Sequence, residues 1–427
     1  MAIRLQGLFI GLNGQDHFIC RSETIYEIRQ KKKNNESNIH NCYGCGVCTA
    51  SCGKKIINIC LNRDGFYEPY IEDQNKCTEC GICLDVCAFN HEERALKTEE
   101  IQTKSWAAWS NDEDIRRKCS SGGIGFEIGK QLIEQGYQAI GCRYDINEQR
   151  AEHYIAVTVE DFVQSIGSKY IQSYTADAFK LVQKRGQKYL VTGTPCQIDS
   201  FRRMIRKFEC EKNFILLDFF CHCVPSMHTW KAYIKMLEPK IGKVTYASWR
   251  NKFEFGWHDS WIMGIDGEKT SKPIDWYDSY NLIIKEKKTA ICSRMSRGDL
   301  FYKLFLGDIT LGPQCQKQCK YKYAKSSADI RIGDLWGRTY QADQKGVSAL
   351  VSFTEKGRQI VESLRGVTLI EHPFEIVAEG QMKKNAHQKE IRSAAIFLLR
   401  NNVSITSLPF KAIFFAQRVF SKIKLYI

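Results

Sequence analysis

Short apolar runs alternate with amphipathic segments along most of the chain. Between about residues 105 and 365, apolar runs such as FILLDFF (214–220) end in loops rich in Gly, Ser, Cys or Asp. Segments with helical spacing follow several of these loops, as where Ile124, Ile128 and Leu132 recur after a Ser-Gly-Gly turn. Strands that alternate with amphipathic helices predict an α/β domain over residues 105–365.

The chain on either side of this domain has a different pattern. Residues 1–37 end in a polar tract and are predicted to form an N-terminal extension and linker. Residues 38–97 are rich in cysteine and contain one strand-like run, FYEPYI (66–71). Residues 366–427 contain two helical patterns and are predicted to form a helical C-terminal extension. The expected fold is α/β, in the broader α+β sense, with a small cysteine-rich domain in front.

Cysteine spacing carries the most specific information in the chain. The pattern C-x2-C-x2-C-x3-C occurs twice, at 42–52 and at 77–87. This spacing is typical of a bacterial two-cluster ferredoxin domain, in which the fourth Cys of each run ligates the other [4Fe-4S] cluster. The predicted ligands of one cluster are Cys42, Cys45, Cys48 and Cys87, and those of the second are Cys52, Cys77, Cys80 and Cys83.

Zinc and disulfides are the two alternatives for these cysteines. A third Cys two residues after a C-x2-C pair is surplus to a tetrahedral zinc site. Disulfides require an oxidising compartment, and the first residues, MAIRLQGLFIGLNGQ, lack the character of a cleavable signal, so we expect a cytoplasmic protein. Gly53 and Ala88 stand where a ferredoxin usually has Pro, but Pro is not a ligand. Iron–sulfur clusters are therefore favoured.

Further cysteines follow predicted strands. Cys196 comes after the turn at 193–195, Cys221 after FILLDFF, and Cys315 and Cys319 lie in LGPQCQKQCKY. We expect these four to come from three strand-end loops and to converge at the carboxyl edge of one sheet, where they would bind a third [4Fe-4S] cluster. Ordinary buried thiols are the alternative. Substitute ligands are Cys223 or Cys292, and the cysteines interpreted as structural are Cys20, Cys60, Cys119, Cys142 and Cys210.

Composition limits the partners. The 427 residues carry a formal charge of +14, which suits a phosphate-bearing cofactor, an acidic electron carrier or a membrane surface, or is simply a solvated basic surface. Lys and Arg are spread along the chain, which argues against nucleic acid. The chain contains no run of about 18 apolar residues, so no membrane span is predicted. The last helical pattern carries Lys411, Arg418, Lys422 and Lys424, and packing onto protein is favoured over a membrane surface.

Five short motifs occur in a characteristic order. They are SSGG (120–123), GSKYIQS (167–173), GTPCQ (193–197), CHCVPS (221–226) and IGDLWG (332–337), with the Cys315 and Cys319 pair before the last. In this respect the chain resembles the beta-subunit family of coenzyme F420 hydrogenases and dehydrogenases, over roughly residues 40–365. The chain departs from the family pattern at Cys223, usually Gly, and in the C-x3-C spacing of the paired cysteines, usually C-x2-C.

The resemblance implies a flavoprotein fold that binds FAD and is joined to iron–sulfur clusters. It places the pyrophosphate of FAD near the 120–123 loop and the flavin ring near the 193–197 turn. Lys169 would lie close to the negative charge of the reduced ring or of a phosphate, and Asp334 would lie at the same edge of the cofactor site. The implied cofactor-binding residues are Ser120, Ser121, Gly122, Gly123, Lys169, Gly193, Thr194, Pro195, Gln197 and Asp334, and the implied catalytic residues are Lys169 and Cys196.

Together these features predict an oxidoreductase. Electrons would pass through the [4Fe-4S] clusters between a ferredoxin-like partner, or a companion oxidoreductase subunit, and a small-molecule substrate docked at FAD. The alternative is an electron-transfer subunit without a substrate of its own that serves a separate catalytic chain. A third hypothesis, a structural iron–sulfur protein that binds nucleic acid, predicts no flavin.

Overall fold

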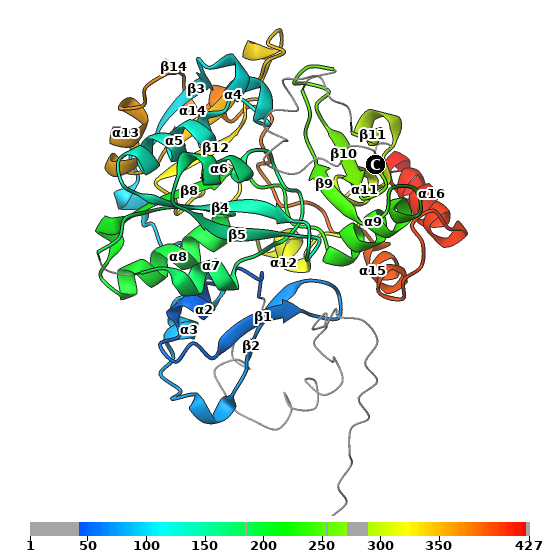
Figure 1. The fold of residues 1–427 in the computed structure, drawn as a ribbon, viewed down its shortest axis with the longest axis horizontal. Helices are drawn as coiled ribbons and strands as arrows, with labels where there is room; N and C mark the ends of the chain where they lie inside the picture. Colours follow the sequence, from blue (N-terminus) through cyan, green and yellow to red (C-terminus); the bar gives the residue numbers. More distant parts are fainter. Residues whose placement is uncertain (1–41, 184–185, 253–254, 271–288, 424–427) are drawn as a thin grey trace, which may run out of the picture.

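A nine-stranded mixed sheet forms the centre of the computed structural model, which describes residues 42–183, 186–252, 255–270 and 289–423 (Figure 1). The predictions for residues 1–37 and for Cys20 lie outside these ranges. In sheet order the strands are β14 (Val367–Glu371), β3 (Lys104–Ser110), β13 (Ser348–Ser352), β12 (Ile330–Asp334), β8 (Phe214–Phe219), β7 (Tyr189–Thr192), β4 (Gln138–Asp145), β5 (Arg150–Ala156) and β6 (Ser173–Tyr174). The middle strands β12, β8, β7 and β4 are parallel, so an α/β fold is confirmed in its mixed form.

Both faces of the sheet are covered by helices. Along β8, Ile215 and Leu217 pack in one core with the inner side of α5 (Ile124–Glu134), whereas Phe214 and Leu216 pack in another with α8 (Pro195–Lys207). Side chains alternate between the faces of a strand, and a strand buried on both faces needs apolar residues at every position. This is why FILL has no polar alternation.

Further short helices are distributed along the described residues. The α-helices are α4 (Glu113–Lys118), α6 (Val159–Phe162), α7 (Ala176–Leu181), α12 (Pro313–Lys317), α13 (Glu355–Glu362) and α14 (Phe374–Val377). The 3-10 helices are Gln74–Lys76, Ala88–Asn90, Thr98–Glu100, Val163–Ser165, Glu211–Asn213, Met295–Arg297 and Arg338–Tyr340.

A second, smaller sheet stands beside the first and was not predicted. Its strands, in sheet order, are β11 (Ile291–Arg294), β10 (Ile262–Gly267) and β9 (Val244–Ser248). Around it lie α9 (Met227–Ile241), α11 (Leu300–Phe305), α15 (Arg392–Arg400) and α16 (Leu408–Ile423). The two predicted C-terminal helices are therefore present as α15 and α16.

The predicted boundary at residue 365 is wrong. Residues 366–427 begin with β14, which pairs antiparallel with β3 at the edge of the main sheet. The α/β domain therefore continues past 365, and the helical extension starts only at α15. The strand escaped prediction because VTLIE is short and, as an edge strand, is only partly buried.

Residues 42–97 form the cysteine unit. It contains α2 (Val47–Ser51), β1 (Ile57–Leu61), β2 (Tyr67–Ile71) and α3 (Ile82–Asp85), and β2 coincides with the predicted strand FYEPYI. Gly46 and Gly81 precede the two helices at equivalent places in the two cysteine repeats, each with a φ of 74°. Glycine adopts this left-handed conformation without steric cost, so the chain turns sharply after the second Cys of each repeat.

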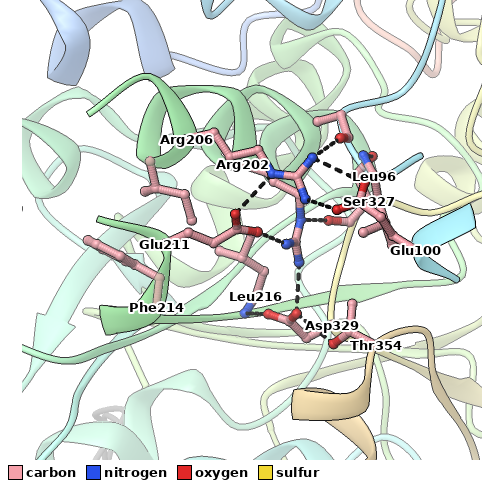
Figure 2. A network of polar contacts seen from close by, with 12 residues as sticks. Leu96, Glu100, Arg202, Arg206, Glu211, Phe214, Leu216, Ser327, Asp329 and Thr354 are labelled. Atoms are coloured by element: carbon pink, nitrogen blue, oxygen red, sulfur yellow. Dashed lines mark hydrogen bonds and ion pairs between the residues drawn. The ribbon is translucent and has the colours of Figure 1, made fainter. Parts of the chain in front are cut away.

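A partly buried polar network connects residues 96–100, where the cysteine unit ends, to α8 and the α/β domain (Figure 2). Arg202 of α8 donates to the Ser327 carbonyl at 2.6 Å and to the Asp329 carboxylate at 2.8 Å. One turn further along α8, Arg206 donates to Glu100 at 2.6 Å. Arg202 is almost completely buried, so its charge is balanced inside the protein. The network fixes the link between the cysteine unit and β3.

Candidate cofactor site

A cavity of about 480 Å³ lies at the carboxyl ends of β7, β8 and β12. Its lining draws on the five motifs found in the sequence: Ser120, Ser121, Gly123, Lys169, Gly193, Thr194, Gln197, Cys221, His222, Cys223, Asp334 and Trp336. Pro195 and Cys196 instead line a smaller neighbouring cavity, and Cys221 and Cys223 border both. We refer to these as the main cavity and the small cavity.

Gly122 supports the site without lining it. A side chain at Gly122 would place its Cβ 2.4 Å from the Ala108 carbonyl oxygen, and the Gly122 N–H donates to Ser348 Oγ at 3.0 Å. The SSGG loop is thereby pressed onto β3 and β13. Gly123 follows with a φ of 90°, and α5 begins at the next residue. The amino end of α5 therefore opens at the main cavity, where Ile124 and Gly125 join the lining.

Lys169 lies in the wall of the main cavity. Its ammonium donates to the carbonyls of Gln164 and Ile166 at 2.9 and 3.1 Å. Burial lowers the pKa of Lys169 to about 8. The preceding residue, Ser168, donates to Ser120 Oγ at 2.8 Å and ties this loop to the SSGG loop.

Arg250 supports the wall of the main cavity without lining it, and it was not predicted from the sequence. It is buried, donates to the Asp334 carboxylate at 3.0 Å and to the Tyr170 hydroxyl at 3.2 Å, and lies 4.8 and 5.2 Å from the rings of Trp261 and Trp336. Asp334 is thus neutralised by Arg250. The surrounding sequence, SWRNKFEFGW, matches no motif. Its only hint was an arginine among aromatic residues, which is too common to single out.

His153 of β5 lines the main cavity and contributes a buried, unsatisfied ring nitrogen. Its Nε2 is 3.0 Å from the Thr192 carbonyl, a geometry in which Nε2–H donates. Its Nδ1 is buried and has no hydrogen-bond partner among the described residues. Burial lowers the pKa of His153 to about 4, which keeps the ring neutral and leaves Nδ1 as a bare acceptor. Cys119 and Cys142, interpreted as structural, also line this cavity.

Five cysteines line the small cavity, Cys223 among them, and we call the four predicted ligands the third thiol group: Cys196, Cys221, Cys315 and Cys319. Cys196 stands at the start of α8, with its sulfur 3.1 Å from Thr194 Oγ1, the N-cap oxygen. Burial raises the pKa of Cys221 to about 12 against the opposing charge of Lys322, and the charges of Cys315 and Cys319 add to the rise. These thiols therefore resist ionisation unless a cation offsets their charge.

The predicted origin of these thiols needs a correction. Cys196 and Cys221 do follow β7 and β8, but Cys315 belongs to α12 and Cys319 to the turn after it, so they do not end a strand. Cys223 lies within hydrogen-bond reach of Cys315, whereas Cys292 is exposed on β11 and lines neither cavity. Of the two substitute ligands, only Cys223 lies beside the third thiol group.

Lys322 lies between the two cavities and lines both. It donates to the Cys221 carbonyl at 2.7 Å and to the His222 carbonyl. Burial opposes its charge, but the nearby thiols outweigh this and raise the pKa of Lys322. His222 is paired through Nε2 with Asp308 at 2.9 Å, so the imidazole is held by a carboxylate. The Lys322 ammonium therefore places a positive charge at the boundary between the main cavity and the third thiol group.

We call the two predicted ligand sets of the cysteine unit the first thiol group (Cys42, Cys45, Cys48, Cys87) and the second thiol group (Cys52, Cys77, Cys80, Cys83). In the second, burial and then the charges of Cys80, Cys52 and Cys77 raise the pKa of Cys83 to about 11. The neighbours of Cys83 thus include the fourth Cys of the other repeat. Cys80 is exposed, so this group reaches the surface.

The first thiol group lies next to the third. The Cys45 sulfur is 3.5 Å from Ser200 Oγ, and Ser200 follows Cys196 by one turn of α8. Tyr43, beside Cys42, lines the small cavity and donates to the Gln314 carbonyl at 2.9 Å. The first turn of α8 and Tyr43 therefore separate these two groups.

Among the described residues, no group of three or more His, Cys, Asp or Glu side chains is arranged to hold a single metal ion.

One family matches most of the chain outside the cysteine unit. Its description is coenzyme F420 hydrogenase/dehydrogenase, beta subunit, and its N-terminal part matches residues 105–180, whereas its C-terminal part matches residues 186–373. The chain belongs to this family. The resemblance seen in the motifs is confirmed, and an oxidoreductase or electron-transfer subunit of this type is the function class that follows.

Individual relatives are distant. A coenzyme F420-dependent sulfite reductase of Methanocaldococcus jannaschii is 26% identical over 361 residues, which are 82% of this chain and 50% of that protein. An uncharacterised protein of the same organism is 23% identical over 194 residues, 39% of this chain and 53% of that protein. The chain thus spans about half the length of the curated relatives it matches.

Among solved structures, the F420-reducing [NiFe] hydrogenase complex from Methanosarcina barkeri contains a similar chain. The match has a TM-score of 0.39 and 17% identity, and it covers 73% of this chain and 91% of that one. None of the described helices of the present protein has the length and apolar character needed to cross a membrane.

Proposed function

We propose that the protein is an iron–sulfur flavoprotein that binds FAD in the main cavity and passes electrons to or from a small-molecule substrate. Its volume of about 480 Å³ falls in the range of roughly 300–1,000 Å³ typical of small-molecule sites. Lys169 and Lys322 are basic lining residues, and the carboxylate of Asp334 is already paired with Arg250. A cavity with this balance favours an anionic cofactor such as a dinucleotide.

The chain supplies two further features that suit FAD. The amino end of α5 opens at the cavity beside Ser120 and Ser121, and amides at a helix start attract phosphate. The unsatisfied Nδ1 of His153 would accept a hydrogen bond from an N–H group of the cofactor. A purely apolar cavity would offer neither a phosphate-binding helix start nor an unsatisfied hydrogen-bond acceptor.

The three thiol groups are proposed as [4Fe-4S] ligands. The first and second groups would hold one cluster each, with the fourth Cys exchanged between repeats as the sequence predicts. The third thiol group would hold a third cluster, with Cys223 as a spare ligand. Iron would offset the charge of thiols that burial otherwise keeps protonated.

Each part of the site has a distinct task. When bound, FAD would supply the conversion between hydride and single-electron chemistry. The Lys322 ammonium would stabilise the negative charge of an electron that passes between FAD in the main cavity and a cluster on the third thiol group. Arg250 holds Asp334 and the aromatic wall in one arrangement. The apolar side chains of Phe219, Phe220 and Leu217 line the cavity and exclude water.

A single observation carries this proposal: Cys221 and Cys223 border both the main cavity and the small cavity. A group in the main cavity and a cluster on the third thiol group would therefore share a wall. Short separations of this kind are what electron transfer between a flavin and a cluster requires. The exposed second thiol group would be the entry or exit point for a ferredoxin-like partner or companion subunit.

Anaerobic purification followed by iron, sulfide and flavin analysis tests the proposal. Three clusters and one flavin predict about twelve iron atoms and one FAD per chain. About eight iron atoms would remove the third cluster, provided that Cys196→Ala leaves the flavin spectrum unchanged. A preparation without flavin would overturn the assignment of the main cavity.

The second candidate function is an electron-transfer subunit without a substrate of its own. It is favoured by the length comparison, because the aligned sulfite reductase is twice as long as the matching region. In that case a separate chain would provide the catalytic centre. Turnover of a small oxidant by the isolated holoprotein would support the enzyme, and turnover only after addition of a companion chain would support the subunit.

A further inference from the structure

The last helix of the described chain, α16, has two apolar faces. Its inner face carries Phe410 and Ile413, which are buried in the core around α9 and α11. Its outer face carries Leu408, Phe415 and Val419, which are 78%, 68% and 39% exposed. Packing of the helix onto protein, the favoured expectation, is confirmed for the inner face alone. Packing within this chain therefore does not explain the apolar residues of the outer face.

The exposed apolar residues form one stripe. Leu408, Phe415 and Val419, together with the exposed Ala412, recur every three or four residues and therefore lie along one side of the helix. We call these four residues the outer stripe. Scattered exposed apolar residues are normal on a protein surface, but a continuous row on one helix marks an interaction site.

Basic side chains flank the outer stripe. Lys411 and Arg418 are exposed and fall on one side of it at helical spacing. Lys303, from α11, lies nearby with its ammonium 5.7 Å from the ring of Phe414. Residues 391–427 contain no Asp or Glu and six Lys or Arg. The formal side-chain charge of this stretch of sequence is therefore +6.

We propose that the outer stripe lies on an anionic membrane surface, with α16 parallel to the plane of the lipid. A row of Phe, Leu and Val beside Lys and Arg is the arrangement by which an interfacial helix inserts side chains at the headgroup boundary. The basic flank meets the negative charge of the lipid headgroups. No membrane span is involved, in agreement with the lengths of the described helices.

Charge makes a second copy of this chain a poorer occupant. A symmetric pair would place the same patch against itself, so Lys411 and Arg418 would face their own counterparts. Such like-charge contacts would oppose the burial of the stripe. A lipid surface offers the opposite charge and has no fixed shape to match.

The position of α16 leaves the electron-transfer parts accessible. Figure 1 shows α16 at one edge of the molecule beside α9 and α11, whereas β1 and β2 of the cysteine unit lie at the bottom of the same view. A protein attached through α16 can therefore still present the exposed Cys80 and the second thiol group to a partner. Attachment would restrict the protein to reactions at or near the lipid surface.

Flotation of the full-length holoprotein with lipid vesicles tests the proposal. We expect binding to vesicles that contain phosphatidylglycerol, weaker binding to phosphatidylcholine alone, and loss of binding at high salt. Phe415→Ser should weaken binding about tenfold or more, because it removes the largest side chain of the stripe. Replacement of both Lys411 and Arg418 by Gln should weaken binding to the anionic vesicles selectively, by about tenfold or more.

Leu181→Ser is the matched control, because Leu181 is also 68% exposed but lies on α7, away from α16. It should bind vesicles like the unmodified protein. The proposal is overturned if the unmodified protein does not bind the anionic vesicles, or if Phe415→Ser binds as well as Leu181→Ser. Self-association that Phe415→Ser abolishes, without vesicle binding, would instead assign the stripe to a second copy. Val419→Ser provides a second variant should Phe415→Ser fold poorly.

Discussion

The two cysteine-bearing regions of this protein are built in opposite ways. In the cysteine unit, eight thiols come from two short repeats, and glycines at 46 and 81 turn the chain so that neighbours in sequence become neighbours in space. The third thiol group instead draws on α8, the segment after β8, and α12. The first arrangement depends on local geometry, whereas the second exists only if the main sheet is correctly assembled.

The two regions should therefore respond differently to change. A local repeat keeps its shape when distant parts loosen, because its turns are set by its own residues. The third thiol group and the main cavity depend on buried charges, such as Arg202, Arg250 and Lys322, that hold separate segments together. Mutations can separate the two regions experimentally.

The largest expected effect is on iron content and electron transfer. Cys45→Ser should remove the cluster of the first thiol group, and Cys196→Ala the cluster of the third, each lowering the iron content by about four atoms per chain. Both should abolish electron transfer between the flavin and an external carrier. Iron analysis with electron paramagnetic resonance of the reduced protein is the measurement.

A buried cysteine outside the thiol groups provides the control for these cysteine variants. Cys210 is buried but lines neither cavity and belongs to no thiol group. Cys210→Ala should leave the iron content unchanged. Equal iron loss in Cys210→Ala and Cys196→Ala would mean that Cys196 acts through general stability and not as a ligand.

The next largest effect is on stability. Arg202→Leu leaves Asp329 buried without its main partner, and loss of one partner of a buried ion pair costs about 3–5 kcal/mol of the free energy of unfolding. Chemical denaturation measures the loss. Arg358→Leu, which breaks the exposed pair with Glu355, should change stability far less. A similar loss in both variants would contradict the role of the network in Figure 2.

The same network predicts a pH dependence. Burial raises the pKa of Asp329, but Arg202 and Lys356 outweigh burial and hold the pKa below its usual value. A carboxyl group with a lowered folded-state pKa stabilises the fold above its unfolded pKa of about 4, and the contribution is lost as the pH falls through the folded value. Stability should therefore drop less steeply with acid in Arg202→Leu than in the unmodified protein.

A smaller effect is expected for the charge between the two cavities. Lys322→Gln removes a buried positive charge beside the third thiol group and should lower the reduction potential of that cluster, on the order of tens of millivolts. Redox titration followed by electron paramagnetic resonance resolves this from the clusters of the cysteine unit. Lys235→Gln, at an exposed position on α9, should shift no potential. A uniform shift of all three clusters would argue against a local effect.

The smallest effect concerns cofactor retention. His153→Phe keeps a ring in place but removes the acceptor Nδ1, and loss of one hydrogen bond should weaken FAD binding about tenfold. Equilibrium dialysis of the flavin measures the change. His153→Gln retains an acceptor and should recover part of the affinity. Unchanged binding in His153→Phe would show that Nδ1 does not contact the cofactor.

Features that depend on local spacing could be predicted from the amino-acid sequence. They are the cysteine repeats, the strands at 189–192 and 214–219, the start of α5 and the two C-terminal helices, and each follows from period or turn chemistry within a short segment. The order of five short motifs also indicated the family correctly. These features do not need knowledge of which segments meet.

Packing between distant segments determines the rest of the site. Arg250, Lys322 and His153 were not recognised as parts of it, because an isolated Arg, Lys or His has no pattern and acquires its role only from distant neighbours. The origin of Cys315 in α12, the edge strand β14 and the outward stripe of α16 likewise follow from packing. Burial and long-range contact select these residues, and neither is written in the local sequence.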